Sequence, residues 1–207
     1  MEKFKIIALA GVGRAGKDTF YKFASEFLAE NGISSGRWAF ADELKKDLDE
    51  FVKDKFGYSV FTDDPVLKNE IRDLMVSYGK IWRKKSLGSH WISKIKSSLL
   101  AEDGPQIRFI TDLRFGKFGE SDEIHFVKSN GGSIIHIERF EEPDWLGNCQ
   151  IVEPANEEER QNDPLLKKNA DVKIQWHDFK TNILGEEVGK KIVSNVFQNN
   201  LNLWTLN

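Results

Sequence analysis

The chain has 207 residues, of which 40% are hydrophobic and 30% charged, and its formal net charge is −3 at pH 7. This length suits one α/β domain with a full core, and the negative charge argues against a surface that coats duplex nucleic acid, which needs a dense cationic face. The single cysteine rules out an internal disulfide, the four histidines show no zinc-type spacing, and no apolar stretch approaches membrane-spanning length, so a soluble protein of a reducing compartment is expected.

The first predicted strand is the apolar run over residues 4–10, which leads directly into a glycine-rich turn. Apolar residues at helical spacing predict a helix over 17–31, and a short strand is expected at 37–40. Asp42 is expected to cap the next helix, which would end at Gly57.

Two more helices are predicted before the chain returns to the sheet. They cover about 64–79, with a proline in the first turn, and about 89–104. No strand is expected between residues 42 and 104, so this segment is interpreted as a helical insert. A buried strand at 107–111 and a helical segment at about 118–129 follow.

The last third of the chain contains two predicted strands, at 133–137 and 172–174, and a final helix at about 184–198. The span 139–164 is acidic, poor in aliphatic residues and rich in proline, which favours a mobile, lid-like flap. Alternating strands and helices predict a central parallel sheet covered on both faces. The expected fold is therefore a single three-layer α/β/α domain over 1–207.

The glycine-rich turn has the pattern of a phosphate-binding loop. Glycines allow successive N–H groups to point at an anion, and the following helix presents its positive end to the same place. Asp18 stands where Ser or Thr is usual, and Asp18 or Thr19 is the candidate ligand for Mg²⁺. A turn without a ligand is the alternative. The predicted ATP-binding residues are Gly11, Gly13, Arg14, Ala15, Gly16, Lys17, Asp18 and Thr19.

A second candidate pair, Asp112 and Arg114, follows the buried strand at 107–111. Ligands bind at the carboxyl ends of strands in open α/β sheets, so these side chains are expected beside the loop. A structural ion pair at the strand end is the alternative. A phosphoryl-transfer enzyme needs two sites at this edge and a closing element that excludes water, which the insert and the flap would supply.

Four segments resemble the deoxynucleoside monophosphate kinases of tailed bacteriophages, within the wider P-loop nucleoside monophosphate kinase group. They are the Gly-Lys-Asp-Thr loop, Phe40–Lys45, the block from Arg72 to Trp91, and the Thr-Asp-Leu-Arg-Phe segment ending at Phe115; the polar stretch before Asp171 is a weaker fifth. The chain departs from the family pattern where Glu43 replaces a proline, where Met75-Val76 replace Leu-Gln, and where Lys80 replaces a threonine.

The resemblance implies transfer of the γ-phosphoryl group of ATP, with Mg²⁺, to the 5′-phosphate of a deoxynucleotide. Lys17, Arg114 and Arg139 would be catalytic through charge neutralisation. Acceptor binding has an alternative at three of the implied positions. Arg83 could belong to a solvated face, Lys45 could be a plain surface lysine, and Trp91 could pack in the core. The implied acceptor-binding residues are Gly13, Phe40, Ala41, Lys45, Arg72, Arg83, Trp91, Asp112 and Arg114.

The expected partner is a deoxynucleoside monophosphate, with no direct contact to nucleic acid or membrane. The expected location is the cytoplasm (of the host, if the protein is phage-encoded), and a homodimer is left open. Trp176 and His177 lie where related kinases hold adenine, whereas His136 is interpreted as a core histidine. Two other functions remain: a kinase of a different phosphorylated metabolite, such as phosphomevalonate, and a nucleotide sensor without catalysis.

Overall fold

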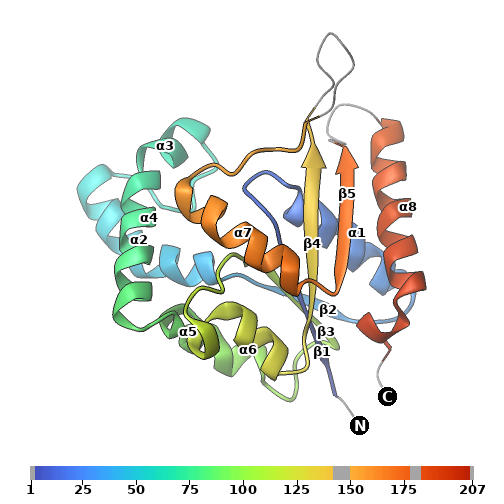
Figure 1. Ribbon diagram of the computed structural model, residues 1–207. Helices are drawn as coiled ribbons and strands as arrows, with labels where there is room; N and C mark the ends of the chain where they lie inside the picture. The colour runs from blue at the N-terminus through green and yellow to red at the C-terminus, as the bar shows by residue number, and fades with distance from the viewer. Residues whose placement is uncertain (1–2, 142–149, 178–182, 206–207) are drawn as a thin grey trace.

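The computed structural model describes residues 3–141, 150–177 and 183–205. In these residues, parallel strands form one sheet in the order β2-β3-β1-β4-β5. The strands are β1 (Lys5–Ala10), β2 (Ser35–Trp38), β3 (Ile107–Leu113), β4 (Ser133–Phe140) and β5 (Val172–His177). Because every described strand is parallel, all carboxyl ends lie at one edge of the sheet (Figure 1).

Helices connect the strands and cover both faces of the sheet, as the sequence predicts for an α/β/α fold. They are α1 (Lys17–Glu30), α2 (Phe40–Phe56), α3 (Pro65–Glu70), α4 (Arg72–Lys85), α5 (Ser89–Leu99), α6 (Glu123–Ser129), α7 (Glu157–Asn169) and α8 (Ile183–Asn199). None of the described helices has the length and apolar character needed to cross a membrane.

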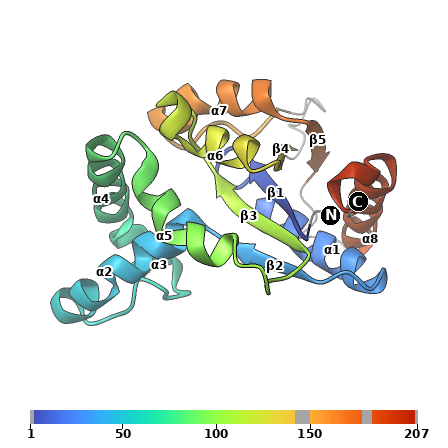
Figure 2. The same ribbon diagram turned by 90° about the horizontal axis from the view of Figure 1, so that it is seen from below.

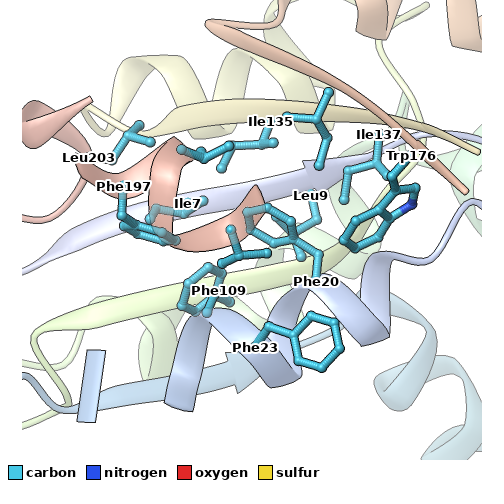
Figure 3. Close-up of a cluster of buried hydrophobic side chains, with 14 of the residues drawn as sticks. Ile7, Leu9, Phe20, Phe23, Phe109, Ile135, Ile137, Trp176, Phe197 and Leu203 are labelled. Carbon is cyan, nitrogen blue, oxygen red and sulfur yellow. The ribbon is translucent and has the colours of Figure 1, made fainter. Parts of the chain in front are cut away.

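The central strand β1 is buried on both faces, which explains its continuous apolar sequence. Ile7 and Leu9 face α1 and α8, where they join a cluster that includes Phe109 and Phe197 (Figure 3). The alternate residues of β1 face the cluster formed with α5, α6 and α7 on the other side (Figure 2). The prediction of a parallel sheet covered on both faces is confirmed.

Helices α2, α3 and α4 gather to one side of the sheet, as Figures 1 and 2 show. They have a small core of their own, in which Leu48 and Val52 of α2 pack with Val60 and Ile71. Gly79 lets α4 approach α2 closely, since a Cβ there would lie 2.7 Å from a methyl carbon of Leu44. These helices are most of the predicted helical insert.

Helix boundaries in this region differ from the sequence predictions. α2 begins at Phe40, not at Asp42, because the carboxylate of Asp112 accepts hydrogen bonds from the first N–H groups of the helix. The helix predicted over 64–79 is two helices that meet at Ile71, and the second one continues beyond Gly79 to Lys85.

The predicted flap over 139–164 is partly regular structure, and residues 142–149 lie outside the described residues. β4 extends to Phe140, and α7 begins at Glu157 and continues through Pro164 to Asn169. The side chain of Asn156 caps α7 by accepting a hydrogen bond from the N–H of Glu159. Three glutamates in the first turn add a favourable interaction with the helix dipole, so this acidic run starts a helix.

Candidate active site

The loop between β1 and α1 has the backbone of a phosphate-binding loop. Gly11 and Gly16 have φ angles of 129° and 95°, and Arg14 has a φ of 65°. A Cβ at Gly11 would lie 2.3 Å from the carbonyl oxygen of Ile137, so only glycine fits between β1 and β4. These left-handed residues curl the loop in the way the glycine pattern predicts.

Trp176 of β5 packs against the phosphate-binding loop and supports it. Its indole N–H donates to the carbonyl oxygen of Ala15 at 2.9 Å, and its ring would lie 2.7 Å from a Cβ at Gly16. The ring is 2% exposed and packs beside Phe20 (Figure 3). The structure therefore gives Trp176 a supporting role under the loop, while contact with adenine stays a prediction for Trp176 and for the neighbouring His177, which both line the cavity described next.

Lys17 is buried at the start of α1, where a charged group is costly. Its ammonium donates to the carbonyl oxygens of Gly11 and Val12 at 2.7 and 2.8 Å. Burial, reinforced by the positive charge of Arg114, lowers the pKa of Lys17 to about 8. An anion bound beside these two cations would relieve this cost, so the loop fits a phosphate chain.

A cavity of about 870 Å³ opens in front of the loop. It lies at the carboxyl edge of the sheet, where residues from the ends of β1, β3 and β4 meet. This volume is sufficient for a nucleoside triphosphate. Its lining includes Gly13, Arg14, Gly16, Lys17, Asp18, Thr19, Arg37, Ala41, Asp42, Lys45, Asp112, Arg114, Arg139, Trp176 and His177.

A second cavity of about 240 Å³ lies between the sheet edge, the helical insert and the start of α7. Its walls are largely apolar, and its lining also includes charged side chains. Ala41, Lys45, Asp112 and Arg114 line both cavities, so the two spaces adjoin. The remaining lining includes Phe40, Leu44, Met75, Val76, Gly79, Lys80, Arg83, Trp91, Phe115, Glu123, Asn156, Glu158 and Glu159.

Asp112 has a structural role as well as a place in both cavities. Its two carboxylate oxygens accept hydrogen bonds from the N–H groups of Phe40 and Ala41, at 2.9 and 2.8 Å. Burial raises the pKa of Asp112, against the effect of these bonds and of the nearby Arg114. The carboxylate thus ties the start of α2 to the end of β3 and fixes the wall that the cavities share.

Arg114 is held by a carboxylate that the sequence analysis missed. Its guanidinium donates to Glu159 of α7 at 2.6 Å, and the other oxygen of Glu159 accepts from the loop N–H of Gly13 at 3.0 Å. Burial would raise the pKa of Glu159, but bonds from Gly13 and Ala155, with the charge of Arg114, lower it overall. The capping pattern from Asn156 to Glu159 could have predicted this helix start from the sequence. It could not have predicted that Glu159 bonds Gly13 and Arg114.

Arg83 is an internal ion-pair residue in this structure, although it also lines the smaller cavity. It is 7% exposed, and its guanidinium bonds Asp122 and Glu123 at 3.1 to 3.3 Å. The same group stacks on the ring of Phe115, 3.4 Å from its centre. The alternative of a solvated face is wrong for Arg83, which is buried, and contact with an acceptor stays a prediction.

Replacing Arg83 with methionine is expected to destabilise the protein by about 3–5 kcal/mol, because it leaves the buried carboxyl groups of Asp122 and Glu123 without the guanidinium that bonds both of them. Urea unfolding measures this loss. The matched control is Arg72→Met on the same helix; Arg72 is exposed, so a change within about 0.5 kcal/mol is expected. A stable Arg83→Met variant that fails only in acceptor binding would assign Arg83 to the acceptor instead.

The other predicted acceptor residues differ in their relation to the two cavities. Phe40 and Trp91 are buried in the core cluster on the α5 side and also line the smaller cavity. Lys45 lines both cavities, and its ammonium lies 5.6 Å from the centre of the Phe61 ring. Arg72 lies exposed at the start of α4 and is absent from the lining of both cavities.

Asp18 and Thr19, the predicted magnesium ligands, line the larger cavity next to Lys17. Among the described residues, no group of three or more His, Cys, Asp or Glu side chains is arranged to hold a metal ion. A magnesium ion at Asp18 or Thr19 would therefore need phosphate oxygens and water as its other ligands, which is usual for this ion.

No model of a known protein family matches the sequence, and no curated protein matches it. Among solved structures, the chain is similar to the shikimate kinase of Acinetobacter baumannii in complex with shikimate, at 14% identity and a TM-score of 0.44 over 97% of each chain. The shikimate kinase of Aquifex aeolicus has 18% identity and a TM-score of 0.36, over 95% of this chain and 98% of that one. The strand order and the loop geometry of the chain itself define its α/β/α fold.

Proposed function

We propose that the protein transfers the γ-phosphoryl group of ATP to the 5′-phosphate of a deoxynucleoside monophosphate. The observation that carries this proposal is the pair of adjoining cavities, one against the phosphate-binding loop and one largely apolar, with Arg114 and Asp112 in both linings. Two substrates in these spaces would meet at the guanidinium of Arg114.

The larger cavity is the proposed ATP site. Lys17 and Arg14 would neutralise the phosphates, and Arg139 at the end of β4 would add a further positive charge to the same cavity. Asp18 and Thr19 are the residues that would hold Mg²⁺. When bound, this ion neutralises phosphate charge during transfer.

The smaller cavity is the proposed acceptor site. Phe40, Leu44 and Trp91 offer apolar surface to a base, and Arg114 and Lys45 lie on the side that faces the loop. A phosphate acceptor is already nucleophilic at neutral pH, so the chemistry needs positioning and positive charge more than a base. Arginine suits this work because its planar fork bonds two phosphate oxygens.

An acceptor panel tests the proposal. The protein is incubated with ATP, Mg²⁺ and each deoxynucleoside monophosphate in turn, and ADP and the deoxynucleoside diphosphate are both quantified. At least one deoxynucleotide is expected to give the two products in equal amounts. Turnover of only a non-nucleotide acceptor, phosphorylated or hydroxylic, would reject the deoxynucleotide, and ATP binding without acceptor-dependent ADP release would favour a sensor.

The buried lysine predicts a characteristic pH profile. Lys17, with a pKa of about 8, is charged below this pH and neutral above it, so kcat/KM for ATP should fall about tenfold per pH unit above about pH 8. Lys17→Arg keeps its charge over this range and should abolish the fall, whatever its absolute rate. A wild-type profile that stays level to pH 10 would contradict this assignment.

A further inference from the structure

The carboxylate of Glu159 accepts hydrogen bonds from donors that a bound phosphate would be expected to use. One oxygen accepts from the N–H of Gly13 in the loop, and the other accepts from Arg114. The side chain is only 10% exposed, and the N–H of Ala155 provides a further bond. A backbone N–H of the loop and an arginine at a strand end are typical anion-binding groups, and here they hold an anion that belongs to the protein.

Glu159 reaches this position because α7 is anchored around it. Asn156 caps the helix one turn earlier, and Glu158 pairs with Lys80 of α4 at 3.5 Å. On the next turn the side-chain amide of Asn162 donates to the carbonyl oxygen of Glu158, and its oxygen accepts from the N–H of Gly116. The start of α7 therefore forms a wall of the smaller cavity, and Glu159 lies where that cavity approaches the loop.

We propose that Glu159 holds the acceptor-phosphate position in the absence of substrate and that an incoming phosphate displaces it. The identity of that phosphate as part of a deoxynucleotide depends on the proposed function; the displacement itself does not. Arg114 and the Gly13 N–H cannot bond a carboxylate and a phosphate in the same place, because two anions at contact distance repel strongly. Glu159 would also compensate the charges of Arg114 and Lys17 while the site is empty, so only an anion that bonds both groups well would replace it.

The test compares the binding of inorganic phosphate by the wild type and by Glu159→Gln, using calorimetric titration without ATP. The variant keeps the shape of the side chain and removes its charge, so phosphate should bind it at least about tenfold more tightly. Glu157→Gln removes the same charge from an exposed position on the same helical turn, and should change the affinity less than about twofold.

A second measurement detects the displacement itself. Amide hydrogen exchange over residues 156–162 should rise when phosphate binds the wild type, because the start of α7 loses its bonds to the loop, and should change less in Glu159→Gln. Equal or weaker phosphate binding by Glu159→Gln, no phosphate binding by either protein, or unchanged exchange in the wild type would each overturn the proposal. None of these outcomes depends on turnover of a deoxynucleotide, which the acceptor panel decides separately.

Discussion

Replacing Lys17 with alanine is expected to lower kcat/KM for ATP by at least about 10³-fold while leaving the fold intact. The ammonium is buried, bonds two loop carbonyls and has a lowered pKa, so it is held in the site at a cost to stability. Its removal therefore costs little folding free energy and deprives the phosphates of their nearest cation. Product formation under saturating Mg²⁺ and acceptor measures the loss.

The matched control for this variant is Lys53→Ala. Lys53 is an exposed residue of α2 that pairs with Asp49 within its own helix, so its removal should change neither the rate nor the unfolding midpoint appreciably. Normal turnover by Lys17→Ala would remove this lysine from the mechanism. A collapsed unfolding midpoint for the same variant would instead assign it a structural role.

Replacing Arg114 with alanine is expected to lower kcat by about 10²- to 10³-fold and to change the affinity for ATP much less. Arg114 lines both cavities, and its guanidinium bonds Glu159 of α7. Its charge would therefore act where the phosphoryl group passes from one substrate to the other. Initial rates over a grid of ATP and acceptor concentrations separate kcat from the two affinities.

Arg160→Ala is the control for Arg114→Ala, since Arg160 is an exposed arginine that pairs with Glu157 along α7. Arg114→Lys should recover only part of the rate, because an ammonium cannot bond two phosphate oxygens in one plane. The effects of Arg114→Ala and Glu159→Gln on phosphate binding should not add, because the two side chains contact each other. If Arg114→Ala lowered only the affinity for ATP, Arg114 would be assigned to the ATP site instead.

The sheet and the phosphate-binding loop were predictable because their signals are local. Apolar runs fix the strands buried on both faces, and glycines at positions 11 and 16 mark the left-handed backbone of the loop. The adjacency of the loop to Asp112 and Arg114 also follows from the rule that parallel strands end at one edge.

The remaining features depend on partners that are distant in the sequence. Asp112 caps a helix that begins 72 residues earlier, which moves the start of α2 away from Asp42. Arg83 and Arg114 are both arginines near predicted site segments. Arg83 is buried and pairs with Asp122 and Glu123, whereas Arg114 lines both cavities. No local pattern distinguishes these two environments.

The region around Glu159 shows a different cause of error. Its acidic and proline-rich composition suggested an irregular flap. Composition does not record the order of the residues, and the order decides where a helix starts. The position of Asn156 directly before three glutamates is a helix-start signal that outweighs the average. The resulting helix carries the carboxylate that contacts both the loop and Arg114.

The support that Trp176 gives to the loop has a consequence for biosynthesis. The indole that bonds the Ala15 carbonyl of the loop is 161 residues further along the chain, so it is synthesised well after the loop. A nascent chain that ends before β5 has the glycine motif without the ring that packs beneath it. The loop should therefore become a competent phosphate-binding site only after β5 has been synthesised and has joined the sheet.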